Sequence, residues 1–141
     1  MKPLAFALLA ALAVPAASAQ YGWPRDLEPQ LRQAANAIYA RGFRQQGTVV
    51  AAALEPGDYQ DVNIDLGPGE YEVLVVCNTD CGDVDVALMG RRSRAAARDG
   101  SVGDVATLRI ERTEAGRIRL RVTMDVCLAD ACRFALAVFG R

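Results

Sequence analysis

Histidine is missing from this chain of 141 residues, and lysine occurs once, as Lys2. Histidine is the residue that most often serves as a general base or as a metal ligand. The chain therefore has no Ser–His or Cys–His nucleophile of its own, and beyond Lys2 it has no amine for a Schiff base. Serine is also scarce, since only Ser93 and Ser101 occur after position 20. Paired carboxylates and thiols are the groups that remain for catalysis.

Neither an excess of charge nor a membrane-spanning run is present. Lys and Arg number 16 against 17 Asp and Glu, a formal net charge of −1, so there is no general attraction to nucleic acid or anionic lipid. The apolar run 4–14 is shorter than the roughly 20 residues that cross a bilayer. It follows Lys2 and precedes the small-residue motif Ala17-Ser18-Ala19, an order typical of a secretory signal peptide. We expect cleavage after Ala19, no membrane span, and a periplasmic or secreted protein.

The segment after the signal peptide is predicted to be helical. Apolar residues recur at helical spacing over 24–45. Asp26 is the expected N-cap, Pro29 falls in the first turn, and Gly42 is the expected stop. The predicted organisation is a signal peptide at 1–19, a helix and linker at 20–47, and a β-sandwich domain at 48–141. A helix in this place is expected to cover one face of the domain, with docking to another protein as the alternative.

From Thr48 onward the apolar period changes from 3.6 to 2. Residues 59–66 show it clearly, because Val62, Ile64 and Leu66 alternate with polar residues. Short strands separated by frequent turn signals predict an all-β antiparallel sandwich of about eight strands. The expected strands are 48–54, 59–66, 70–77, 84–89, 94–98, 105–113, 117–126 and 133–139. The strand at 94–98 is included because it places the loops after Val76 and Val126 at the same end of the sandwich.

Four cysteines form two close pairs, Cys77 with Cys81 and Cys127 with Cys132, and each pair follows a strand. In an exported domain such pairs indicate two disulfides rather than a zinc site or a redox motif. Three connectivities are open. Crossed pairs would close longer loops and stabilise more, about 4 against 2 kcal/mol each on the chain-entropy model. Proximity during folding favours the local pairs Cys77–Cys81 and Cys127–Cys132, because each brackets a turn.

Aspartates are concentrated beside the first cysteine pair. Asp80, Asp83 and Asp85 lie within six residues, and oxygen-rich loops of this kind suit calcium, which takes 6–8 oxygen ligands. Asp83 and Asp85 share one face of a strand, so they form a candidate calcium site together with Asp80. One alternative is that Asp80 and Asp83 cap turns while Asp85 faces solvent or pairs with an arginine; another is a pair of carboxylates of a small hydrolase.

Arginines are concentrated on two strands late in the chain. A hairpin joined by Glu114-Ala115-Gly116 would pair Glu111 with Arg119 and Arg109 with Arg121. Its outer face would then carry four arginines, Arg109, Arg117, Arg119 and Arg121. Because like charges oppose cross-strand pairing, these side chains must splay, find carboxylates on a neighbouring strand, or bind an anionic partner. The set is therefore a candidate anionic-ligand patch, with a balanced solvated face as the alternative.

The strand motifs together resemble the bacterial pre-peptidase C-terminal domain over about residues 48–139. The segments that carry the resemblance are Gly69 to Cys77, Asp80 to Leu88, Ala97 to Asp99, Gly116 to Val122 and Cys127 to Val138. The sequence departs from the family pattern at 90–93, where Gly-Arg-Arg-Ser replaces a D-x-x-G turn. The resemblance implies an eight-stranded jelly-roll-like sandwich that is not itself catalytic. Some members bind calcium, but no ligand set carries over to these residues.

These observations predict a non-catalytic interaction or accessory module of the cell envelope, not an enzyme. Its expected partner is an envelope protein or a polysaccharide, and binding to nucleic acid is not expected. Calcium is the only cofactor considered. The alternatives are a calcium-stabilised accessory domain and a small carboxylate-based hydrolase.

Overall fold

The computed structural model describes residues 22–141. The signal peptide predicted at 1–19 lies outside the described residues. Within 22–141, no helix has the length and apolar character needed to cross a membrane.

Helix α2 runs from Glu28 to Ala40 and is shorter at both ends than the predicted 24–45. Leu27, not Asp26, occupies the N-cap position without a side-chain hydrogen bond, because Asp26 instead forms an ion pair with Arg133 on the last strand. The predicted stop is confirmed. Gly42 has φ +87°, a conformation that other residues rarely adopt, and its N–H donates to the Tyr39 carbonyl at 2.9 Å.

Eight strands form two four-stranded antiparallel sheets, which confirms the predicted all-β sandwich. The strands are β1 (Arg44–Leu54), β2 (Tyr59–Leu66), β3 (Gly69–Cys77), β4 (Cys81–Met89), β5 (Ala95–Arg98), β6 (Val105–Arg112), β7 (Gly116–Cys127) and β8 (Cys132–Gly140). One sheet has the order β1-β8-β3-β6 and is called the helix-side sheet; the other has the order β2-β7-β4-β5 and is called the open sheet. Strands that alternate between two sheets in this order form a jelly roll.

The core between the sheets is built by the period-2 pattern. Val62, Leu66, Val84 and Val86 of the open sheet face Val73 and other buried residues of the helix-side sheet in one apolar cluster. The polar residues between them point outward, so the open sheet has one solvated face, as is common in antiparallel sheets.

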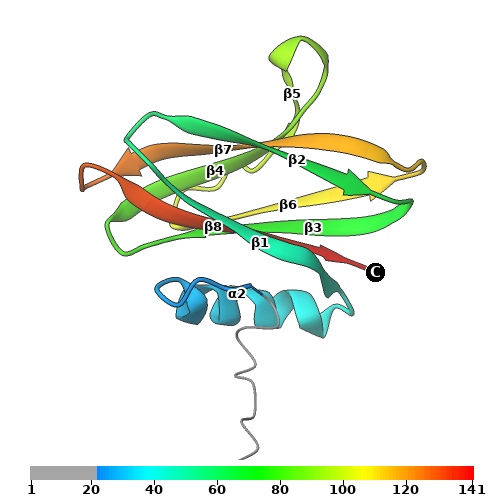
Figure 1. Ribbon diagram of the computed structural model, residues 1–141, viewed down its shortest axis with the longest axis horizontal. Helices are drawn as coiled ribbons and strands as arrows, with labels where there is room; N and C mark the ends of the chain where they lie inside the picture. Colours follow the sequence, from blue (N-terminus) through cyan, green and yellow to red (C-terminus); the bar gives the residue numbers. More distant parts are fainter. Residues whose placement is uncertain (1–21) are drawn as a thin grey trace, which may run out of the picture.

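The helix-side sheet is covered on both faces. Every residue of β3 from Tyr71 to Cys77 is buried. Its outward-facing Leu74 and Val76 pack with Leu31 and Ile38 of α2 in a second apolar cluster. Figure 1 shows α2 lying across this sheet, which gives three layers: helix, sheet, sheet. The apolar run in β3 therefore reflects two buried faces.

The predicted hairpin between residues 105–113 and 117–126 is wrong. β6 pairs with β3, and β7 pairs with β2 and β4, so the short connection after Arg112 carries the chain from one sheet to the other. Leu108 and Leu120 both reach the core, as expected, but they do so from opposite sheets. The alternation of apolar residues is the same in both arrangements, so it does not distinguish them.

Candidate functional site: a carboxylate cluster on the open sheet

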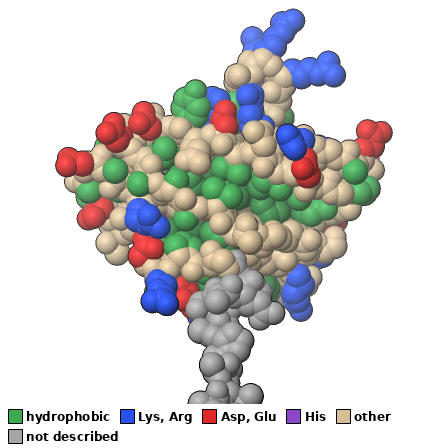
Figure 2. Space-filling view, viewed as in Figure 1, with side chains coloured by type: hydrophobic (Ala, Val, Ile, Leu, Met, Phe, Trp, Pro, Cys, Tyr) green, Lys and Arg blue, Asp and Glu red, His purple; other side chains and the backbone are tan. Residues whose placement is uncertain are grey.

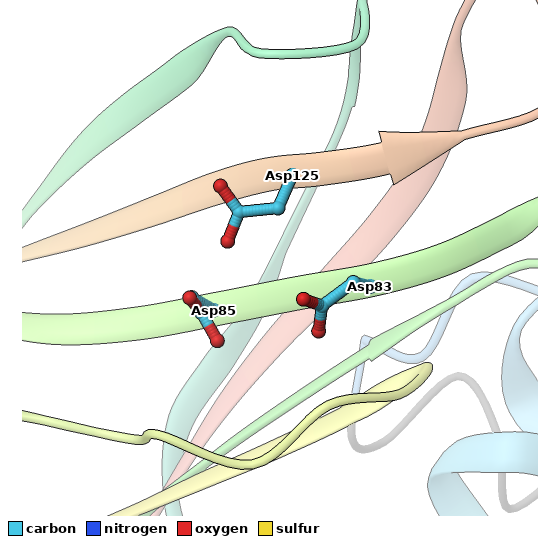
Figure 3. Close-up of side chains that lie close together, drawn as sticks. All are labelled: Asp83, Asp85 and Asp125. Atoms are coloured by element: carbon cyan, nitrogen blue, oxygen red, sulfur yellow. The ribbon is translucent and has the colours of Figure 1, made fainter.

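Three aspartates meet on the outer face of the open sheet. Asp83 and Asp85 come from β4, and Asp125 comes from β7; one carboxylate oxygen of each lies within 4.8 Å of the others. Figure 3 shows the three side chains together across the two strands. We call Asp83, Asp85 and Asp125 the carboxylate cluster.

An irregularity in strand pairing positions this cluster. The register of β4 with β7 shifts on both sides of Asp83, which lies opposite Val126, while Val84 lies opposite Met124. Asp125 therefore occupies the irregular position between them. Gly82 permits the close approach, because a Cβ there would lie 2.8 Å from Val126 Cγ1.

The three carboxylates have different partners. Asp83 accepts a hydrogen bond from the backbone N–H of Gly103 at 3.0 Å. Asp85 Oδ2 accepts one from Arg98 Nη2 at 3.2 Å. The other oxygen, Asp85 Oδ1, is buried and has no hydrogen-bond partner among the described residues. A buried carboxylate oxygen without a partner is costly, so a proton or a cation at this position would stabilise the site.

Within the carboxylate cluster, Asp85 has a shifted pKa. The pKa of Asp85 is raised from 3.8 to about 6, first by burial and then by Asp125, while Arg98 acts in the opposite direction. Two ionised carboxylates cannot donate to each other, so Asp85 and Asp125 form a hydrogen bond only when one is protonated. Asp85 can thus hold a proton in mildly acidic solution, or the cluster can offer at least three oxygens to a hard cation, with water completing the coordination.

The sequence placed two of these three residues in a candidate site and missed the third. Asp80 is exposed in the turn before β4 and is outside the carboxylate cluster. Its backbone carbonyl accepts from Leu128 N–H at 2.8 Å, so the loops after β3 and β7 do lie at the same end of the sandwich, as predicted. Asp125 follows the outward-facing pattern of β7, but finding it requires knowing that β7 pairs with β4.

The disulfides brace this same end. The structure contains the two local pairs, Cys77–Cys81 and Cys127–Cys132, each with a Cα–Cα distance of 5.9 Å. Cys77 ends β3 of the helix-side sheet and Cys81 begins β4 of the open sheet; the second pair joins β7 to β8 in the same way. Each disulfide therefore ties the two sheets together where the chain crosses between them. Such bonds are typical of proteins that mature in an oxidising compartment outside the cytoplasm.

The four arginines of the candidate anionic patch do not share a surface. Arg109 lies on β6 in the helix-side sheet, near the buried Glu72 and 5.8 Å from the Phe43 ring centroid. The other three lie on β7, where two have direct cross-strand partners on β2: Arg117 opposite Asp65 and Arg121 opposite Asp61.

Those cross-strand partners neutralise the arginines of β7. Arg121 makes two hydrogen bonds to Asp61, at 2.7 and 2.9 Å, and its guanidinium lies 3.8 Å from the Tyr59 ring centroid. This hydrogen bonding holds the pKa of Asp61 below its ordinary value. Arg117 bonds Asp65 at 3.0 Å, and Arg119 lies 3.9 Å from Asp61. The arginines of β7 are therefore paired with carboxylates on the neighbouring strand β2. This is one of the three arrangements that the sequence analysis considered.

Three surface hollows among the described residues lie away from the carboxylate cluster. A hollow of about 430 Å³ lies between α2 and the start of β6, lined by Gln30, Ala34, Val105 and neighbours. Smaller hollows of about 250 and 200 Å³ share Gln46 and Tyr71 in their linings. None of the three is lined by an aspartate of the cluster.

Comparison with known structures identifies the fold. The structure is similar to the pre-peptidase C-terminal domain of collagenase from Bacillus anthracis, with a TM-score of 0.50 and 16% identity over 64% of this chain and 87% of that one. A periplasmic inhibitor of g-type lysozyme from Aeromonas hydrophila has a TM-score of 0.46 and 11% identity over 70% of this chain and 87% of that one. No protein-family model matches the sequence, and no curated protein matches it. The chain has a pre-peptidase C-terminal-like fold, as its motifs predict, and at such low identity the likeness concerns the fold alone.

Proposed function

We propose that this protein is a non-catalytic interaction or accessory module that acts in the periplasm or outside the cell. The observation that carries the proposal is the position of the carboxylate cluster, on the outer face of a sheet and outside the hollows described above. The chain also has no histidine, and its two disulfides fit an oxidising compartment. The expected partner is an envelope protein or a polysaccharide.

The experiment that tests this proposal is a turnover assay. Protein purified from an oxidising compartment is incubated with p-nitrophenyl glycosides, p-nitrophenyl esters and casein, beside the double variant Asp85→Asn and Asp125→Asn. We expect the same background rate for both proteins, because neither carboxylate acts on a substrate. Turnover by the unmodified protein that the double variant lacks would favour the carboxylate-based hydrolase instead.

A second candidate function is that of a calcium-stabilised accessory domain. It is favoured by three carboxylates whose oxygens lie within 4.8 Å and by the unpartnered Asp85 Oδ1. Asp83, Asp85 and Asp125 would hold the ion, which would link β4 to β7 and stabilise the fold.

Calcium binding is tested by thermal unfolding in calcium, in magnesium and in EDTA. At a calcium concentration of about 100 times Kd, the gain in unfolding free energy is about 2.7 kcal/mol, a rise of several degrees in Tm. The variant Asp125→Asn should lose this rise, whereas Asp80→Asn, outside the cluster, should keep it. An equal shift with magnesium, or an unchanged shift in Asp125→Asn, would contradict a calcium site at this cluster.

A further inference from the structure

The connection between β4 and β5, Gly90–Arg94, projects from the sandwich, and we call it the basic loop. Figure 1 shows it standing clear of both sheets, and Figure 2 shows basic side chains at its tip with no acidic side chain among them. The sequence Gly-Arg-Arg-Ser-Arg places three guanidinium groups within four residues, and all three arginines are exposed.

The arginines of the basic loop are not neutralised by the protein itself. Among residues 22–141, nine ion pairs are formed, and Arg91, Arg92 and Arg94 take part in none of them. Arg119, opposite Met89 at the base of the loop, and Arg98, at the far end of β5, each have an aspartate partner. The charge balance of the open sheet therefore ends where the basic loop begins, and the tip carries uncompensated positive charge.

Two hydrogen bonds connect the basic loop internally and to β7. Gly90 N–H donates to the Arg94 carbonyl at 2.7 Å, and Arg119 Nη2 donates to Ser93 Oγ at 3.4 Å. Arg92 and Ser93 have φ values of +59° and +54°, in the left-handed region. Two successive non-glycine residues in this region are unfavourable, and such conformations are concentrated at binding and catalytic sites. A fixed loop loses little conformational freedom when it binds, which favours recognition.

The composition of the basic loop discriminates between anionic partners. Insertion into a membrane would require a large apolar side chain, and positions 90–94 have none. A sugar ring would stack on an aromatic side chain, and these positions have none of those either. Guanidinium groups bind carboxylates through two parallel hydrogen bonds, which suits the closely spaced carboxylates of an acidic polypeptide.

We propose that Arg91, Arg92 and Arg94 form a docking site for an acidic polypeptide segment of a partner protein. This inference rests on the proposed function, since it names the surface and the partner chemistry of the interaction module. Binding is electrostatic, so it weakens as the salt concentration rises.

The test uses labelled poly-L-glutamate as the probe and fluorescence anisotropy as the readout. The loop variant combines Arg91→Glu, Arg92→Glu and Arg94→Glu. The matched control has the same change in charge at three exposed arginines on the helix side: Arg25→Glu, Arg32→Glu and Arg44→Glu. We expect the loop variant to bind at least tenfold more weakly than the unmodified protein and the control to stay within threefold, with circular dichroism showing both variants folded.

Polygalacturonate and phosphatidylglycerol vesicles are used as competing probes. We expect the unmodified protein to prefer poly-L-glutamate over both. Equal losses in the loop and control variants, or tighter binding of either competing probe, would overturn the proposal. Those outcomes leave the turnover assay unaffected, so failure of the docking site can be told apart from failure of the non-catalytic function.

Discussion

Replacing Asp85 by asparagine should make the protein more stable at neutral pH when calcium is absent. Asparagine has nearly the same shape, it can still accept a hydrogen bond from Arg98, and its amide can donate to the Asp125 carboxylate. It removes the charge that burial and Asp125 disfavour. The pKa of Asp85 is raised from 3.8 to about 6. At about 1.4 kcal/mol per pKa unit, this shift corresponds to an upper bound of about 3 kcal/mol at pH 7.

The expected gain is smaller than this bound, because Asp125 is exposed and its charge is screened by solvent. We expect Asp85→Asn to raise the free energy of unfolding by about 1–2 kcal/mol at pH 7 in EDTA. The size of this gain depends on pH, and its sign does not change. Between about pH 4 and pH 6 the native state holds the Asp85 proton and the unfolded state does not. The stability that this proton gives the unmodified protein is therefore fully present below pH 4 and is lost as pH rises through 6.

The assay is urea unfolding followed by circular dichroism at pH 4, 5, 6 and 7 in EDTA. The free energy of unfolding of Asp85→Asn should be close to that of the unmodified protein at pH 4. It should exceed it by an increasing amount up to pH 7. Asp80→Asn serves as the control, because it removes a carboxylate outside the cluster, and it should give no comparable gain in unfolding free energy at pH 7. A difference for Asp85→Asn that stays constant, or that favours the unmodified protein at pH 7, would refute the electrostatic reasoning.

Three further predictions concern the structural framework. A thiol assay under denaturing conditions should detect no free thiol, and reducing each of the two disulfides should cost about 2 kcal/mol on the chain-entropy model, measured by urea unfolding. Gly82→Ala should cost about 1–3 kcal/mol, because the new Cβ meets Val126 Cγ1 at 2.8 Å, whereas Gly100→Ala, with nothing within 4 Å, should be nearly neutral. Phe43→Ala should cost about 3–5 kcal/mol, because Phe43 is fully buried under α2, and a loss below 1 kcal/mol would contradict packing of the helix on the sheet.

The strands could be predicted from the sequence because their apolar residues alternate with a period of two. The predicted 59–66 coincides with β2, and the strand added at 94–98 exists as β5. The helix was predicted over 24–45, but its helically spaced apolar residues end at Ile38 and α2 ends at Ala40, before the left-handed Gly42. Strand β1 consequently begins at Arg44, earlier than the predicted 48–54.

Strand partners could not be read from the same pattern. A residue such as Leu108 reaches the core whether β6 pairs with β7 or faces it across the sandwich. This ambiguity produced the wrong hairpin and, with it, the supposed arginine patch. It also hid Asp125, whose place beside Asp83 and Asp85 depends on the pairing of β7 with β4. The basic loop was visible in the sequence as a departure from the family turn, but its projection and its lack of carboxylate partners are properties of the fold.

We propose that this protein binds an acidic polypeptide through the basic loop and does not cleave it, and one measurement tests both parts. Labelled poly-L-glutamate is equilibrated with the protein, the bound fraction is measured, and the recovered polymer is sized by mass spectrometry. The account predicts saturable binding that the reversal of Arg91, Arg92 and Arg94 removes, with the polymer recovered at full length. Shortened polymer, or binding that the reversal leaves unchanged, would contradict it.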